Sequence, residues 1–251
     1  MTEPTTMAGP TTRPFLLLVV AKAPVPGLAK TRLTPPATPR QAAEIAAAAL
    51  LDTLDAVLAT PGALPVVAMT GNLDEAARGA RLRGALAGAE VFDQRGADFA
   101  DRLANAHADA AARWPGLPIV QVGMDTPQVT PTLLATIATA LTSTDATADA
   151  VLGPAEDGGW WALGLRDPAA AALLREVPMS TPDTFRHTRL AFTDNGLTVA
   201  ATTELSDVDT MVDAVRVAEA IPGSRFAAAV EAVTLGASSA RNAVLAGGGR
   251  C

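Results

Sequence analysis

Short apolar runs alternate with longer alanine-rich stretches along most of this chain, and that order restricts the fold more than any other feature. The apolar runs are predicted strands at residues 15–21, 64–69, 91–92, 118–122, 149–152, 160–165 and 197–200. Helical spacing of apolar residues predicts helices at 40–58, 74–86, 99–113, 131–141 and 211–220. Strands that alternate with helices form a mainly parallel sheet with helices on both faces. We therefore expect a three-layer α/β fold.

The domain organisation follows from length and composition. With 251 residues, of which 49% are hydrophobic, the chain is long enough for one large core. We expect a flexible N-terminus at 1–14, a single domain at 15–221, and a C-terminal helix with a flexible tail at 222–251. Cys251 is the only cysteine, which excludes an intrachain disulfide and a cysteine-based metal site.

The first apolar run, residues 15–23, is broken by Lys22 and is much shorter than the roughly 18 residues that span a bilayer. No basic segment precedes it, as a secretory signal would require. We expect a cytoplasmic protein without a membrane span. The net charge of −7, with 19 basic and 26 acidic residues, argues against a nucleic-acid-binding surface.

A basic loop directly follows the first strand. It carries the only two lysines of the chain, Lys22 and Lys30, with Arg32, and it contains Pro24 and Gly27. Loops at the carboxyl ends of parallel strands bind ligands in open α/β sheets, and cations there neutralise phosphates. The alternative is a solvated loop whose turns are set by proline. The glycine spacing of a Walker motif is absent.

A lone acid, Asp125, follows the strand at 118–122 and precedes Thr126 and Pro127. A carboxylate at a strand end can hold a divalent cation that bridges diphosphate oxygens. Asp125 can equally cap the Asp-Thr-Pro turn, and the residues alone leave both interpretations open.

Two glycines, Gly158 and Gly159, come directly after Asp157 and before Trp160. Glycine permits a ligand to approach the backbone closely. An acceptor bound there would present a hydroxyl to Asp157, which would orient it or act as a base, and a tryptophan would stack against the acceptor. The alternative is a tight hairpin turn with tryptophan in the core.

Two further acids, Asp207 and Asp209, alternate along an extended segment and so point to the same side. They would complete a metal site with Asp125, or Asp209 would cap the helix that follows.

The segment from Ser180 to Asp183 is typical of a helix start. His107 and His187 fall in separate predicted elements, and we interpret His107 as a packed or surface residue rather than a metal ligand.

Six segments taken in order resemble the bacterial DUF2064 family. They are AKAPVPGLAKTRL, QRGADFADRL, VGMDTPQVTP, GPAEDGGWWALGL, MSTPDT and LSDVDT, and together they span about residues 15–220. This family is associated with radical-SAM and selenoprotein gene neighbourhoods and is often labelled a glycosyltransferase. It belongs to the nucleotide-diphospho-sugar transferase superfamily, which has the Rossmann-like GT-A fold. The superfamily also contains molybdenum-cofactor and phospholactate nucleotidyltransferases.

The resemblance implies a role for each matching residue. Lys22, Pro24, Gly27, Lys30 and Arg32 would form the nucleotide-phosphate loop. Asp125, Asp207 and Asp209 would hold Mg²⁺ or Mn²⁺, and Asp125 and Asp157 would be catalytic. Gly158, Gly159, Trp160 and Thr181 would lie on the acceptor side. The sequence departs from the family pattern at Ala100, Met124, Gln128 and Met179.

These expectations define one leading function and two alternatives. The leading one is a metal-dependent transferase that moves a glycosyl group from a nucleotide-diphospho-sugar to a small acceptor. The first alternative is a nucleotidyltransferase that joins an NTP to a phosphorylated small molecule, and the second is a catalytically silent nucleotide-binding module. The expected partners are the nucleotide and a small-molecule acceptor, without nucleic acid, and a homodimer stays an open option.

Overall fold

A seven-stranded sheet forms the centre of the computed structural model, which describes residues 13–247 and the side chains of residues 13–236. The strands are β1 (Phe15–Lys22), β2 (Ala63–Thr70), β3 (Glu90–Asp93), β4 (Ile119–Gly123), β5 (Ala150–Pro154), β6 (Trp160–Leu165) and β7 (Val199–Ala201). Their order across the sheet is β3-β2-β1-β4-β6-β5-β7. All strands run parallel except β6, which pairs antiparallel with both β4 and β5.

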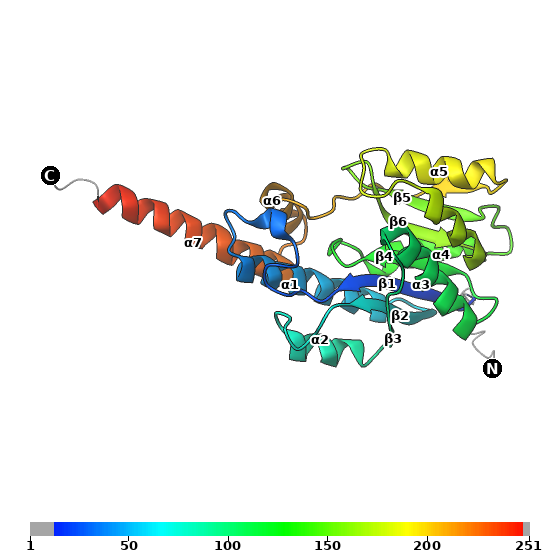
Figure 1. Ribbon diagram of the computed structural model, residues 1–251, viewed down its shortest axis with the longest axis horizontal. Helices are drawn as coiled ribbons and strands as arrows, with labels where there is room; N and C mark the ends of the chain where they lie inside the picture. The colour runs from blue at the N-terminus through cyan, green and yellow to red at the C-terminus, as the bar shows by residue number, and fades with distance from the viewer. Residues whose placement is uncertain (1–12, 248–251) are drawn as a thin grey trace, which may run out of the picture.

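Helices cover both faces of this sheet (Figure 1). They are α1 (Pro39–Leu58), α2 (Gly79–Leu86), α3 (Phe99–Arg113), α4 (Pro131–Thr142), α5 (Thr184–Asp194), α6 (Met211–Ala220) and α7 (Arg225–Gly247), with the 3₁₀ helices η1 (Thr31–Leu33) and η2 (Pro168–Glu176). One core cluster joins α1, α2 and α4 to the sheet, and a second joins α3, η2 and α5 to the opposite face. The strands are apolar on both sides because both faces are covered.

A third cluster lies beyond the sheet, where α1, α6 and α7 meet. Phe226 of α7 is fully buried there, and Arg225 donates to Asp52 and Asp55 of α1 at 2.9 and 2.6 Å. Leu33 and Val208 are buried in the same cluster, so it anchors both the basic loop and the acidic segment. Figure 1 shows α7 extending past the rest of the molecule.

The predicted elements agree with the structure over most of the chain. The helices expected at 99–113 and 211–220 and the strand at 160–165 have the expected bounds. The expected helix at 74–86 begins only at Gly79, because turns occupy the preceding residues and Arg78 adopts a left-handed conformation with φ 53°. The 3₁₀ helix η2 was not expected.

The predicted helix start at Ser180 is wrong. Ser180 has φ 58°, and α5 begins at Thr184 after a turn in which Thr184 N donates to Thr181 O. The expected flexible ends at 1–14 and 222–251 lie in part outside the described residues. Within the described part of the chain, none of the helices has the length and apolarity needed to cross a bilayer.

Candidate active site at the carboxyl ends of the strands

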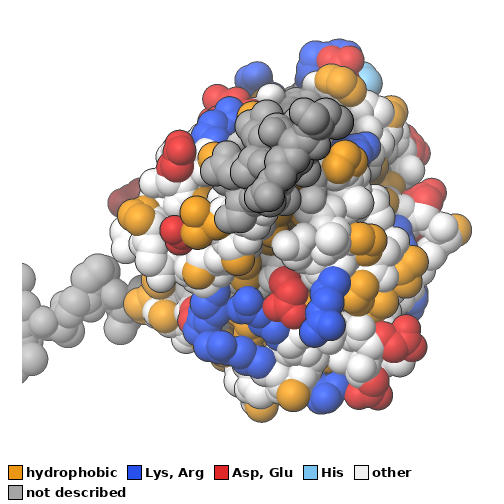
Figure 2. All heavy atoms as spheres, turned by 90° about the vertical axis from the view of Figure 1, so that its left-hand side faces the viewer, with side chains coloured by type: hydrophobic (Ala, Val, Ile, Leu, Met, Phe, Trp, Pro, Cys, Tyr) orange, Lys and Arg blue, Asp and Glu red, His pale blue; other side chains and the backbone are white. Residues whose placement is uncertain are grey.

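The loops that carry the predicted site residues meet at one edge of the sheet. β1 lies between β2 and β4, so the chain order reverses there, and open α/β sheets bind their ligands at such a point, at the carboxyl ends of the strands. The basic loop follows β1, and Asp125 follows β4. On the face toward which β1 points, basic side chains lie next to acidic ones (Figure 2).

The basic loop is held in place by main-chain bonds and by apolar contacts. Ala23 N donates to Thr70 O at 2.7 Å, and Ala77 N donates to Pro24 O at 3.0 Å. Pro24 is buried, whereas Gly27 is exposed and turns the chain with φ +80°. These contacts fix the start of the loop, whereas its middle is exposed.

Lys30 lies at the centre of the charged cluster. Its Nζ donates to Asp125 Oδ2 at 2.7 Å and to Asp209 Oδ1 at 3.1 Å, and its side chain is only 15% exposed. Arg32 donates to Asp209 Oδ2 at 3.0 Å and is itself 76% exposed. Lys22 is exposed and donates from Nζ to Leu28 O at 2.9 Å, within its own loop.

The pKa values of this pair are set by two opposing effects. Burial alone would lower the pKa of Lys30, but the carboxylates of Asp125 and Asp209 raise it above the ordinary value. Burial alone would raise the pKa of Asp125, but the Lys30 ammonium outweighs it and lowers that pKa. Both groups are therefore charged at neutral pH.

The strand end is shaped to receive the Asp125 carboxylate. A Cβ at Gly123 would lie 2.7 Å from Asp125 Oδ1, so a side chain there would push the carboxylate away. Met124, between them, accepts a hydrogen bond at Sδ from Lys22 N at 3.1 Å. Glycine at position 123 thus lets Asp125 lie against the end of β4, facing Lys30.

The two acids of the segment after β7 flank a buried residue, as the period of two predicts. Val208 is 1% exposed in the third core cluster, so Asp207 and Asp209 project away from that cluster. Asp209 pairs with Lys30 and Arg32, whereas the cap of α6 is Thr210, which forms a capping box with Asp213. The alternative role for Asp209 as a helix cap is therefore excluded.

Asp207 is partly buried and lies near other negative charges. Burial, together with the negative charges of Asp125 and Asp157, raises its pKa to about 7. Its Oδ1 is buried and has no hydrogen-bond partner among the described residues. Over the same residues, no three His, Cys, Asp or Glu side chains form a ready-made metal-binding group.

The loop from Ala155 to Gly159 is the tip of the β5–β6 hairpin. Asp157 is exposed, and its Oδ1 accepts from Gly159 N at 2.8 Å. Gly158 has φ +88°, and a Cβ there would lie 1.9 Å from Pro182 O. The close approach to this glycine therefore comes from the chain itself, in the turn that joins β5 to β6.

The other residues expected on the acceptor side bind the start of α5. Phe185 N donates to Gly158 O at 2.9 Å, and Trp160 Nε1 donates to Thr188 Oγ1 at 3.1 Å. The Thr181 hydroxyl lies 3.3 Å from the Thr184 hydroxyl. Trp161 is 2% exposed in the core below the hairpin.

The hairpin and the acidic segment are brought together by main-chain pairing. Leu205 N donates to Pro154 O and Glu156 N donates to Leu205 O, each at 3.1 Å, so the chain before Asp207 continues alongside the end of β5. A cavity of about 170 Å³ lies between them. It is lined by Glu156, Asp157, Ser206, Asp207, Asp209, Asp213 and Arg216.

Two further side chains hold this region together, and the sequence predicts this role for neither of them. Gln128 Nε2 donates to Ser206 O at 2.6 Å and so links the turn after Asp125 to the acidic segment. Arg216 of α6 pairs with Glu156 at 2.7 Å and with Asp213 at 3.3 Å. Gln128 directly follows the turn at Asp125, and this position could have indicated its role. Nothing in the sequence distinguishes Arg216 from other arginines on helices.

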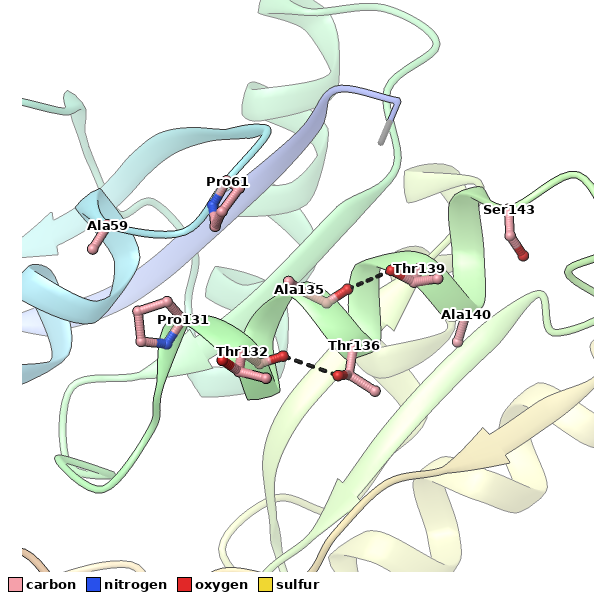
Figure 3. A pocket seen from close by; sticks show the side chains of 9 residues that line it. All are labelled: Ala59, Pro61, Pro131, Thr132, Ala135, Thr136, Thr139, Ala140 and Ser143. Carbon is pink, nitrogen blue, oxygen red and sulfur yellow. Dashed lines mark hydrogen bonds between the residues drawn. The ribbon is translucent and has the colours of Figure 1, made fainter. Parts of the chain in front are cut away.

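A larger groove, of about 660 Å³, lies over α4 and the turn before β2 (Figure 3). None of its nine lining residues is charged. The hydroxyls of Thr136 and Thr139 donate to the carbonyls of Thr132 and Ala135 on their own helix. The groove therefore offers no cation for a phosphate and no base for an acceptor.

His107 is packed in the interior, as expected. It is fully buried, and its Nε2 lies 2.9 Å from Gln121 Oε1 of β4. Burial lowers its pKa to about 4, so it is neutral at physiological pH.

A family model covers the centre of the chain. Residues 53–181, about half of the sequence, match the family DUF2064, described as an uncharacterised protein conserved in bacteria. This protein belongs to the DUF2064 family. The matched range includes Asp125 and Asp157, whereas the basic loop and Asp207 lie outside it. A search of curated proteins gave no match.

Solved structures with the same fold identify its class. A protein from Desulfovibrio desulfuricans G20, provisionally assigned as a nucleotide-diphospho-sugar transferase, superposes with a TM-score of 0.74 at 22% identity over 86% of this chain and 93% of that one. A cytidylyltransferase from Leptospira borgpetersenii serovar Hardjo-bovis gives 0.52 at 12% identity, over 90% and 96% of the two chains. The 4-diphosphocytidyl-2C-methyl-D-erythritol synthase from Anaerococcus prevotii gives 0.51 at 12% identity, over 81% and 94%. This DUF2064 protein thus has the fold of nucleotide-diphospho-sugar transferases, which confirms the predicted fold class.

Proposed function

We propose that this DUF2064 protein is a metal-dependent transferase that moves a glycosyl group from a nucleotide-diphospho-sugar to a small acceptor. The observation that carries the proposal is the cluster of Lys30 with Asp125, Asp207 and Asp209 at the point where the strand order reverses. Open α/β sheets bind their ligands at that point. The cluster combines cations suited to phosphates with oxygens suited to a hard metal ion.

In this proposal the basic loop binds the donor diphosphate. Lys22 ends β1, and Lys30 and Arg32 follow in the loop after it, so all three contribute positive charge at the carboxyl end of this strand. Charge-assisted hydrogen bonds to phosphate oxygens are shorter and stronger than neutral ones. The exposed turn at Gly27 and the buried Pro24 shape the loop around the ligand.

Asp125, Asp207 and Asp209 would hold Mg²⁺ or Mn²⁺. The fit rests on the donor set, which is made of carboxylate oxygens only, and on the buried Asp207 Oδ1 that has no other partner within the described structure. A bound divalent cation would stabilise the negative charge that develops on the leaving phosphate. Gln128 would position this set, because its bond to Ser206 O ties the turn after Asp125 to the acidic segment.

Asp157 would accept the proton of the acceptor hydroxyl. Its carboxylate is exposed at the tip of the hairpin and lies on the same cavity as Asp207 and Asp209. The bond from Gly159 N holds one carboxylate oxygen and leaves the other for a substrate. Gly158, Trp160 and Thr181 would form the adjoining wall, which is stiffened by the contacts between the hairpin and α5.

Nucleotidyl transfer from an NTP to a phosphorylated small molecule is the second candidate. It is favoured by the presence of three cations within eleven residues of one loop. A free triphosphate carries more charge to neutralise than a diphosphate ester does. Replacing Lys22 should separate the two functions, because a third phosphate would be its ligand.

The test is a thermal-shift screen of UDP-, GDP-, ADP- and dTDP-sugars against the four NTPs, each with Mg²⁺ or Mn²⁺. A ligand at 100 times its Kd adds about 2.7 kcal/mol to the apparent stability. We expect one nucleotide-diphospho-sugar to raise the Tm only with metal, and we expect Asp125→Asn to abolish that rise. Stabilisation by an NTP alone, with a larger loss for the NTP in Lys22→Ala, would favour nucleotidyl transfer. Absence of stabilisation by every nucleotide would overturn both functions.

A further inference from the structure

Lys30 already bridges two of the acids to which the metal site is assigned. Its Nζ bonds Asp125 Oδ2 and Asp209 Oδ1 at the same time, at 2.7 and 3.1 Å. An ammonium ion is a compact, strongly hydrated point charge, and here it contacts two carboxylates as a cation between them would. A metal ion that is bound by both carboxylates therefore competes with the Lys30 ammonium.

The backbone keeps Lys30 in this position. Lys30 adopts a left-handed conformation, with φ 48° and ψ 45°, directly before η1. Ala29, directly before it, and Leu33, three residues after it, are buried, so the path of the loop directs the side chain to the acids.

The acidic cluster contains more carboxylates than cations, which favours binding of a divalent ion. The four carboxylates of Asp125, Asp157, Asp207 and Asp209 face two cations, Lys30 and Arg32. The nearby Arg216 is paired with Glu156 and Asp213 instead. The carboxylates thus outnumber the cations, and a bound divalent cation would reduce the repulsion among the carboxylates.

On the basis of the metal-dependent transferase proposed above, we propose that Lys30 is an internal cation that divalent metal displaces from Asp125 and Asp209. Its ammonium becomes available to a phosphate only after the metal has bound. Lys30 is then a positioning residue for the acids in the ligand-free protein and a phosphate ligand in the loaded one. Because coupling between two sites is reciprocal, metal and nucleotide would each strengthen the binding of the other.

The chain permits a direct test, because it contains only two lysines. Selective ¹⁵N labelling of lysine gives two Nζ signals in NMR, and Lys22→Met assigns them. Titration with Mg²⁺ alone, without nucleotide, should move the Lys30 signal and leave the Lys22 signal in place. This measurement uses the wild-type protein and needs no variant at position 30.

A second measurement compares metal affinities by calorimetry. Lys30→Met removes the competing ammonium and should bind Mg²⁺ about tenfold more tightly than wild type, equivalent to about 1.4 kcal/mol. Lys22→Met is the matched control. It removes the same charge from the same loop, but Lys22 donates to a carbonyl rather than to the acids, so its Mg²⁺ affinity should stay within about twofold of wild type.

The outcomes separate this inference from the proposed function. If Mg²⁺ binds the wild type and Lys30→Met equally, or if the Lys30 signal stays in place at saturation, displacement is overturned while the metal site stands. Equal gains in Lys30→Met and Lys22→Met would also overturn it, since overall charge would then explain both. If Mg²⁺ binds neither wild type nor Lys30→Met, the inference and the metal-dependent function both fail.

Discussion

The basic loop and the β5–β6 hairpin tip lie on the same edge of the sheet, but different forces shape them. The basic loop places its cations against carboxylates from two other segments, and its glycine, Gly27, has no atom within 4 Å of where a Cβ would be. The hairpin is shaped by backbone contact, because Gly158 lies against Pro182 O. A ligand that binds the basic loop must compete with its ion pairs, whereas a ligand that binds the hairpin tip contacts a surface that is already formed.

The largest effect is expected from Asp125→Asn, which tests the ion pairs made by the basic loop. The change removes a carboxylate from a partly exposed strand end and hardly alters packing, so the fold should persist. Metal-dependent nucleotide binding should be lost, as expected when one ligand of a hard cation is neutralised. Calorimetry with and without Mg²⁺ measures this. Asp74→Asn, at an acid that is 81% exposed and pairs only with Arg83 in the described structure, should leave binding unchanged.

Asp157→Asn tests the chemical role of the hairpin. Asparagine retains the oxygen that accepts from Gly159 N, so the turn and the Tm should be preserved. Turnover should fall by about a hundredfold, the scale of a lost general base, with metal and donor affinities unchanged. Steady-state kinetics and melting curves measure the two effects. Full activity in the folded variant would remove Asp157 from the reaction and leave the hairpin with a structural role only.

Lys30→Ala and Arg32→Ala test whether the basic loop binds the phosphates of the donor. Each should weaken nucleotide binding in the presence of metal by about 1.5–3 kcal/mol, the range for hydrogen bonds to charged groups. Calorimetry of the nucleotide that stabilises the wild type provides the measurement. Arg83→Ala, at an arginine of α2 that pairs with Asp74, is the control for general charge loss. Unchanged affinity in both loop variants would exclude the basic loop from phosphate binding.

The last comparison concerns stability rather than binding, and it separates the two glycines. Both have positive φ, +80° at Gly27 and +88° at Gly158. Gly27→Ala should cost only the left-handed conformation, about 1–2 kcal/mol. Gly158→Ala should cost about 2 kcal/mol more, because the new Cβ also displaces the Pro182 carbonyl. Urea unfolding measures both, and equal losses would mean that the hairpin and α5 move apart without cost.

Sequence patterns predicted the sheet and most helices because the relevant signals are local. Period-two alternation places Phe15, Leu17 and Val19 in one core cluster and the residues between them in the other. Where the prediction failed, a distant contact decided the conformation. The segment from Ser180 to Asp183 has the residues of a helix start. In the structure, however, Pro182 lies against Gly158 in a turn, and α5 begins only after that turn.

The sequence by itself determined the fold class, the two-lysine loop and the presence of acids after successive strands, because each depends on residue type and short-range order. Only the tertiary structure decided how these groups pair. Asp125 and Asp209 are 84 residues apart in the chain and share the Lys30 ammonium. The physical reason is that the strand order β1-β4-β6-β5 brings distant loop ends to one edge, and the buried Leu33 and Val208 fix them there in one apolar cluster. Charge compensation between such loops depends on distances that no local pattern contains.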